Sequence, residues 1–329
     1  MFRYFSSLIG WGWSLIKKIV TSWRVPTLNN NELSSAVEPE IESPEIDHSE
    51  QLTDWVIEPR GEGFRSRINE LWSYRRIGWF FAVRMIKRLY QGTVLGKFWL
   101  LRPIIPIMIG ALIFGALLGV PSDGLPYFLF FLVGSAIWMV FERSCLFLTR
   151  SLDMNKGLIK KLYFPRLVVP VASMAPSVVY FIVFAVLIFL TLLYYQFTEG
   201  RWYLVRGVGP LISLFALCMA VMLSLGIGLF TAIWQVKAKD VRYTLRYVLR
   251  FWGYLTPVIY PLSQVPEEYQ GWMLLNPMAG YVETFKWGLL GTGNFESKFL
   301  LSSLSITVLL LCAGMLYFHY NEAMSVDKM

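Results

Sequence analysis

The sequence is poor in charge, cysteine and histidine. Only 16% of its 329 residues are charged and 56% are apolar, whereas an average globular domain is about 25% charged and roughly 45–50% apolar. The mean hydropathy is +0.51. A water-soluble domain of this length would need more charge on its surface. The composition therefore excludes most soluble classes and indicates a polytopic membrane protein.

The scarcity of cysteine and histidine excludes several kinds of site. Cys145, Cys218 and Cys312 fall in apolar runs, and an odd, scattered set of thiols cannot form a disulfide framework or a zinc site. His48 and His319 lie far apart and have no partner motif. We therefore expect no metal site, no Ser-His-Asp site and no cofactor in this chain.

A nucleotide-binding loop is also missing. The nearest candidate, residues 92–98, has one residue too few between its glycines for a P-loop, and Phe98 stands where the magnesium-binding Ser or Thr belongs. The longest apolar runs are nearly free of the acids and histidines that a proton relay needs. We expect no enzymatic activity in the chain, and the energy for transport would come from a separate subunit.

The charge pattern divides the chain into four parts. Residues 1–25 are basic and aromatic with apolar residues every three or four positions, which predicts an amphipathic helix on the membrane surface or, alternatively, a tolerated extension. Residues 26–63 hold ten acids and one base and predict an acidic disordered linker. Residues 64–102 hold nine bases and one acid and predict a cytoplasmic amphipathic interface helix. Residues 103–329 remain as the membrane domain.

Six apolar runs in the last part are candidates to cross a hydrocarbon core about 30 Å thick. They cover 103–120, 125–148, 167–195, 208–234, 245–260 and 299–318. Arginines and a proline make 245–260 a short span at best, and residues 261–298 are better explained as a re-entrant element. We predict an all-α polytopic membrane protein with six transmembrane helices, an N-terminal amphipathic interface helix and a re-entrant helix pair before the last span.

Lysine and arginine alternate between the loops. Loop 149–166 has five and stretch 235–246 has four, whereas 121–124 has none and 196–207 and 261–298 have two each. Because basic loops stay on the cytoplasmic side, both termini are expected in the cytoplasm. The same rule explains the net charge of +8 without nucleic acid as a partner.

Short motifs follow one another in order along residues 68–329. They are Arg88-Leu-Tyr90, Leu95-Gly96-x-x-Trp99-x-x-x-Pro103, Leu125-Pro126-Tyr127, Gly134-x-x-x-Trp138, Phe164-Pro165-Arg166, Lys239-Asp240-Val241, Pro257-Val258-Ile259-Tyr260-Pro261 and Asn276-Pro277-Met278. With this topology the chain resembles the type-2 ATP-binding-cassette (ABC) transporter permease subunits of bacterial polysaccharide exporters, which move O-antigen, teichoic acid or capsule. Residues 1–63 have no counterpart in that resemblance.

The resemblance implies a homodimer in the bacterial inner membrane with two cytoplasmic ATP-binding-cassette subunits. ATP and Mg would be bound by those partners, and membrane lipids would surround the permease. The cargo would be a lipid-linked polysaccharide, with O-antigen for lipopolysaccharide biosynthesis favoured.

Three groups of candidate site residues follow from the resemblance. A lipid pyrophosphate at the cytoplasmic gate would meet Asn155, Lys160, Lys161 and Arg166, because cations grip phosphate. Aromatic rings pack on sugar faces, and the rings expected along the polymer channel are Tyr127, Phe131, Trp138, Phe141, Tyr260, Tyr281, Phe285 and Trp287. The residues expected to contact the ATPase are Arg75, Arg76, Arg84, Lys87, Arg88, Lys239, Asp240 and Arg242. Plain positive-inside topology and an interfacial aromatic belt stay open as alternatives.

Two other functions also stay open. A permease of this architecture would serve equally for teichoic acid, capsule, a small lipid or a drug. A membrane-embedded enzyme of lipid-linked sugar metabolism would need acids at the outer face. The acids expected there are Asp123, Glu199, Glu267, Glu268, Glu283 and Glu296, without a recognisable motif.

Overall fold

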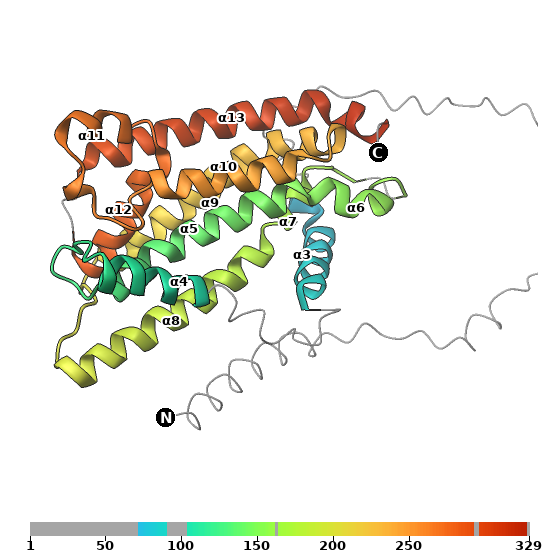
Figure 1. Ribbon diagram of the computed structural model, residues 1–329. Coiled ribbons are helices and arrows are strands. Elements are labelled where there is room, and N and C mark those ends of the chain that lie inside the picture. The colour runs from blue at the N-terminus through green and yellow to red at the C-terminus, as the bar shows by residue number, and fades with distance from the viewer. Residues whose placement is uncertain (1–71, 91–103, 162–163, 293–295, 328–329) are drawn as a thin grey trace, which may run out of the picture. The chain divides into compact units, whose positions relative to one another are not determined.

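The computed structural model describes residues 72–90, 104–161, 164–292 and 296–327. The predictions for 1–25 and 26–63, and part of that for 64–102, lie outside these ranges. The described residues form helices, turns and connections without a strand, so the all-α prediction is confirmed for them. Figure 1 shows the long helices packed side by side as a bundle.

The bundle is built around α9 (Gly209–Lys237). Packed directly on it are α5 (Tyr127–Thr149), α12 (Pro277–Leu290) and α13 (Ser297–Asp327), while α8 (Ala175–Glu199) packs on α5. Most of α5 is buried, whereas most of α8 and α13 faces outward although both are strongly apolar. Apolar outward faces of this kind are suited to lipid rather than to water.

Four helical stretches are long and apolar enough to cross a membrane. They are Tyr127–Ile159, Val168–Glu199, Gly209–Lys237 and Ser297–Asn321. Each overlaps one of the six predicted spans, and the first and second of them include the short helices α6 (Ser151–Ile159) and α7 (Val168–Ala172). The membrane character of the chain therefore rests on these four helices.

The two remaining predicted spans have a different form. The run at 103–120 gives α4 (Ile104–Gly110), which continues as the π-helix η2 (Ala111–Leu117) and is shorter than a full span. The run at 245–260 gives α10 (Val241–Leu255), which is amphipathic because arginines recur along it. It is followed by η3 (Leu262–Gln264) and α11 (Glu267–Met273) before α12 begins.

The ends of α8 and α12 follow from local sequence. Asn276 caps α12, since its Oδ1 accepts a hydrogen bond from Met278 N at 3.1 Å, and Pro277 occupies the first turn, where a proline costs no hydrogen bond. Gly200 and Gly291 follow α8 and α12 with φ of 68° and 69°. Only glycine adopts this left-handed conformation without strain, so both helices stop there.

Small residues bring helix backbones into contact inside the bundle. A Cβ at Gly314 of α13 would lie 2.5 Å from the carbonyl oxygen of Gly226 on α9, and one at Gly226 would lie 2.9 Å from Leu310. Close approach of this kind is how helices associate in lipid, where burial of apolar surface no longer drives packing.

The connections gather at two ends of the bundle. The end of α9, the start of α10 and α6 lie at one end, while α11 and the connections 118–126 and 200–208 lie at the other (Figure 1). Helix α3 (Arg75–Tyr90) crosses the bundle near the first end and packs on α7 and α8. The two connections richest in lysine and arginine therefore share one end, which we call the basic end.

Candidate functional site

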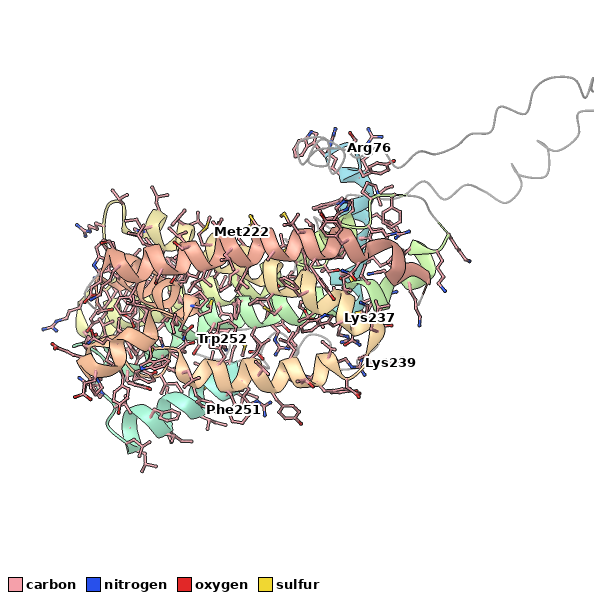
Figure 2. All side chains as sticks on the ribbon, turned by 90° about the horizontal axis from the view of Figure 1, so that it is seen from above. Arg76, Met222, Lys237, Lys239, Phe251 and Trp252 are labelled. Atoms are coloured by element: carbon pink, nitrogen blue, oxygen red, sulfur yellow. The ribbon has the colours of Figure 1, made fainter. Side chains whose placement is uncertain are left out.

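The residues expected to contact an ATPase lie on α3 and around the start of α10. Figure 2 shows Arg76, Lys237 and Lys239 toward the basic end. Arg75, Arg76, Lys87, Lys239 and Asp240 are exposed, and Arg84, Arg88 and Arg242 are partly exposed. The structure thus leaves most of these charges accessible to another protein.

Helix α3 contacts α6 through a hydrogen bond and the connection after α6 through an aromatic pair. Arg88 Nη1 donates a hydrogen bond to the Met154 carbonyl oxygen at 3.0 Å. Partial burial, and secondly the charge of Arg84, lower the pKa of the Arg88 guanidinium from its ordinary value. The rings of Phe81 and Phe164 meet at 5.5 Å inside the same core cluster. Helix α3 is therefore packed against α6 and against the connection that follows α6.

The four residues expected at the gate do not share one surface. Asn155 is buried, and its Nδ2 donates to the Ser151 carbonyl oxygen at 2.8 Å and lies 4.0 Å from the sulfur of Met85. Lys160 and Lys161 are exposed at the end of α6, and Arg166 is partly exposed. The structure therefore brings the two lysines together and places Asn155 in the packing between α6 and α3.

The turn between α9 and α10 is organised by Gln235, which sequence reasoning did not single out. Its Oε1 accepts a hydrogen bond from Arg242 N at 2.9 Å, and its Nε2 donates to the Lys239 carbonyl oxygen at 3.3 Å. Gln235 is itself buried. The loop that presents Lys239 and Asp240 is thus held in a fixed form from within the bundle.

Helix α10 carries two rows of side chains, of which only Arg242 is among the site residues expected from the sequence. Arginines recur at every fourth position, at Arg242, Arg246 and Arg250. Beside them an aromatic row, exposed along its length, consists of Tyr243, Tyr247, Phe251 and Tyr254. Figure 2 shows Phe251 and Trp252 on opposite sides of α10, with Trp252 toward the bundle.

The arginine row of α10 faces further charges on α5 and α6. Arg150 lies within electrostatic range of Arg242, Arg246 and Asp153, and Glu142 within range of Arg246. The Nε atoms of Arg150 and Arg242 are buried and have no hydrogen-bond partner within the described part of the chain. Cations outnumber anions here, so the cluster is suited to hold a phosphate or another anion.

The eight aromatic residues expected along a polymer channel fall into two sets. Buried in the core of the single chain are Phe131, Trp138, Phe141, Tyr281 and Phe285. Partly exposed are Tyr127, Tyr260 and Trp287. The first set packs the bundle: Phe141 and Trp252, for example, meet edge to face at 5.4 Å. Further exposed rings lie on the aromatic row of α10.

A lysine, two polar side chains and three carbonyls organise the irregular chain after α10. Lys286 Nζ donates to the Pro257 carbonyl oxygen at 2.6 Å, Tyr127 Oη donates to that of Ile259 at 2.7 Å, and Asn276 Nδ2 reaches that of Leu255 at 3.4 Å. Backbone outside a helix is tolerated at membrane depth only where protein satisfies it in this way.

Three of the six acids expected at the outer face, Asp123, Glu199 and Glu296, each have a hydrogen-bond or ion-pair partner. Asp123 accepts a hydrogen bond from Ser263 Oγ at 2.9 Å, and Glu296 pairs with Lys298 at 2.7 Å. Glu199 accepts from Tyr203 at 2.7 Å, and this bond is the main reason that the pKa of the Tyr203 phenol is raised. Among the described residues no group of three or more potential metal ligands occurs.

Comparison with known proteins identifies the class. Residues 78–290 match the family model described as ABC-2 type transporter, which is more than half of the chain. The chain therefore belongs to the ABC-2 transporter membrane family and is a transport subunit that crosses the membrane several times.

Among named proteins the chain is similar to O-antigen export system permeases called RfbA. It is 25% identical to the Myxococcus xanthus protein over 223 residues, which cover 67% of this chain and 82% of the relative. It is also 25% identical to a Klebsiella pneumoniae protein over 214 residues, covering 64% of this chain and 79% of the relative.

Proposed function

We propose that this chain is the channel-forming subunit of an ATP-driven exporter that carries lipid-linked O-antigen across the bacterial inner membrane. One observation carries the choice of cargo: the relatives that match over most of their own length bear the name O-antigen export permease. Family membership supports the transport role independently of the cargo. The alternative cargoes remain teichoic acid, capsule, a small lipid or a drug.

The energy comes from a separate ATP-binding subunit, which binds ATP and Mg. ABC-2 family membership implies such a partnership, and the exposed charges of Lys87, Lys239 and Asp240 offer the surface for it. Two permease chains and two ATPase subunits form the complex. Motion of the ATPase reaches the bundle through α3, because Arg88 and Phe81 link that helix to its neighbours.

The membrane topology has six crossings. The four long helices are joined by the α4–η2 helix and by α10, and α11 with α12 forms a re-entrant pair at the far end. The gathering of basic connections at one end supports a cytoplasmic position for that end and for both termini.

The exposed side of α10 lines the path between the two copies. Arg246 and Arg250 are exposed on it, and arginines at membrane depth face a polar path because lipid contact is costly. The aromatic row offers rings to sugar faces. The cationic cluster around Arg150 and Arg242, with Lys160 and Lys161 directly after α6, receives the pyrophosphate of the lipid carrier.

The test of this function uses cells from which the chain has been deleted. We expect lipid-linked O-antigen to accumulate on the cytoplasmic side and to return to the surface when the chain is restored, measured by immunoblotting of surface and internal fractions. Mild-detergent purification of the tagged chain should retain an ATPase at two copies per two chains. Normal surface O-antigen in the deleted cells would contradict O-antigen as the cargo. The absence of an ATPase from the purified complex would contradict ATP-driven transport.

Charge reversal tests whether the cations at the basic end act in the gate or only set the orientation of the chain in the membrane. Replacing Lys160, Lys161 and Arg166 by Glu should abolish export and uncouple ATP hydrolysis in the complex. Arg201 and Arg206, in the connection at the opposite end, give the matched control, whose reversal should leave coupling intact. If export and ATP coupling survive the triple charge reversal, these three residues have no role in the gate.

A further inference from the structure

The groove beneath α3 is a cavity of about 530 Å³ that the transport path does not include. Arg75, Gly78 and Trp79 of α3 form one wall, and Ala175, Val178 and Phe181 of α8 form the opposite one. Residues of α9 close its deep side. A space of this size is in the range of small-molecule and cofactor pockets.

The lining of the groove is almost entirely hydrocarbon. Apart from Tyr74, Arg75, Trp79 and Ser177, the side chains that line it are aliphatic, aromatic or thioether. Ser177 Oγ is buried and has no hydrogen-bond partner among the described residues. Water would find few partners along such walls, so an occupant must be apolar over most of its length.

The groove continues into the outward face of α8. Val178, which lines it, is exposed, and so are Ile182, Val186 and Phe189 further along the same helix. These residues make the apolar face that this membrane protein presents to lipid. The groove is therefore reached from the hydrocarbon of the bilayer rather than from water.

The mouth of the groove is cationic. Helix α3 has no acidic residue from Arg75 to Tyr90, and Arg75 lines the groove while remaining exposed. Its guanidinium lies 5.6 Å from the ring of Trp72, and Trp72 and Trp79 are both exposed. Exposed tryptophans beside arginine are typical of the headgroup region of a membrane, where anionic lipid is attracted.

We propose that this groove binds one anionic phospholipid of the surrounding membrane. One acyl chain lies between Gly78 and Trp79 of α3 and Val178 and Phe181 of α8, and the phosphate is held by Arg75. The lipid then completes the packing between α3 and the bundle. This inference requires only that the chain is a membrane protein, and it stands whether or not the cargo is O-antigen.

A lipid-binding measurement on the full-length chain tests the proposal. The chain is extracted in mild detergent with the subunits that accompany it, and phosphatidylglycerol or phosphatidylcholine is titrated in while native mass spectrometry counts bound lipid. We expect phosphatidylglycerol to be retained in preference, and Arg75→Gln to weaken its binding about tenfold, the loss of one charge-assisted contact. Equal retention of the two lipids by the unaltered chain would overturn the proposal.

Arg76→Gln is the matched control, because Arg76 is the next residue, is exposed and does not line the groove. It should retain phosphatidylglycerol like the unaltered chain. If both substitutions weaken binding equally, the attraction belongs to the basic helix as a whole and the groove is not the site.

A photoreactive phosphatidylglycerol locates the acyl chain without relying on a stable variant. With a diazirine near the end of the acyl chain, labelling should concentrate around Phe181 of α8 and Val221 of α9, both of which line the groove. Ala175→Phe, which fills the groove, should suppress that labelling. Labelling spread evenly over α8 and the outward residues Val308 and Leu309 of α13 would mean ordinary lipid contact and would overturn the proposal.

Discussion

At Lys286 a cation is enclosed without any exposed surface. Its Nζ lies 2.6 Å from the Pro257 carbonyl oxygen, 3.6 Å from the centre of the Phe130 ring and 3.9 Å from a Glu283 carboxylate oxygen. A carbonyl, an aromatic face and a carboxylate together replace the water that the charge has lost. The lysine thereby joins α12, α5 and the irregular chain after α10 at one point.

Removing this charge should destabilise the fold. Lys286→Met leaves the Pro257 carbonyl oxygen without its donor and Glu283 without its counter-ion, so we expect the free energy of unfolding to fall by about 2–4 kcal/mol. The control is Lys298→Met, since Lys298 forms an exposed pair with Glu296 and such pairs contribute about 0–1 kcal/mol. Denaturant titration in detergent measures both. An equal loss of unfolding free energy in the two variants would mean that the contacts of Lys286 do not stabilise the fold.

Gly134 makes room for the same lysine. A Cβ at this position would lie 2.8 Å from Lys286 Cε and 3.2 Å from the Val258 carbonyl oxygen. We therefore expect Gly134→Ala to cost about 1–3 kcal/mol through overpacking, by the same titration. Gly157 of α6 has nothing within 4 Å of its Cβ position, so Gly157→Ala should instead stabilise by about 0.5–1 kcal/mol through helix propensity. A cost at both glycines would contradict the steric explanation.

At the scale of the element, one side of α10 packs against the bundle and the other side is exposed. Trp252 Nε1 donates to Asn276 Oδ1 at 2.8 Å and its ring packs on Phe141, whereas Phe251 is 68% exposed. We expect Trp252→Ala to destabilise the chain by about 3–5 kcal/mol. Phe251→Ala should leave stability within about 0.5 kcal/mol and reduce polymer export, measured as surface polysaccharide per amount of inserted chain. Unaltered export in Phe251→Ala would remove the aromatic row from the path.

The sequence predicts some elements better than others. The difference is whether an element depends on neighbouring residues or on contacts between residues far apart in the chain. The apolar runs at 208–234 and 167–195 match α9 and α8 because composition over a membrane length leaves few alternatives. The arginines of α10 interrupt an apolar run, and only their four-residue period indicates an amphipathic helix instead of a span. The partner of Lys286, the carbonyl of Pro257, is 29 residues away, and no local pattern indicates it.

The exposure of the candidate site residues could be predicted only in part, for the same reason. Positive charge on α3 and at Lys160 and Lys161 is exposed, as residues for solvent or partners must be. Residue type alone does not separate a buried ring from an exposed one, so Tyr281 and Phe141 were grouped with Tyr260 although both have 0% exposure. Burial is decided by the packing of helices distant in sequence, which a motif does not contain.

At the scale of the whole molecule, the proposed dimer makes a prediction about α10. In a chain with Cys218 and Cys312 replaced by Ser, Phe251→Cys should form a crosslink between two copies with a short bifunctional reagent in native membranes. Leu309→Cys on the outward face of α13, 66% exposed, should not. Gel electrophoresis of the tagged chain distinguishes the two. Crosslinking at Leu309 and not at Phe251 would place the contact between copies on the wrong side of the molecule for a path along α10.

The enclosure of Lys286 also has a consequence for the order in which the protein is made. Phe130, Gly134, Pro257 and Glu283, which surround the ammonium group, all precede it in the chain and so leave the ribosome first. By the time α12 emerges, the acceptor and the ring that accommodate its charge already exist, provided that α5 has been inserted correctly. Seating of α12 thus depends on the earlier insertion of α5, since a chain with a misplaced α5 would leave the lysine without the Phe130 ring that its charge contacts.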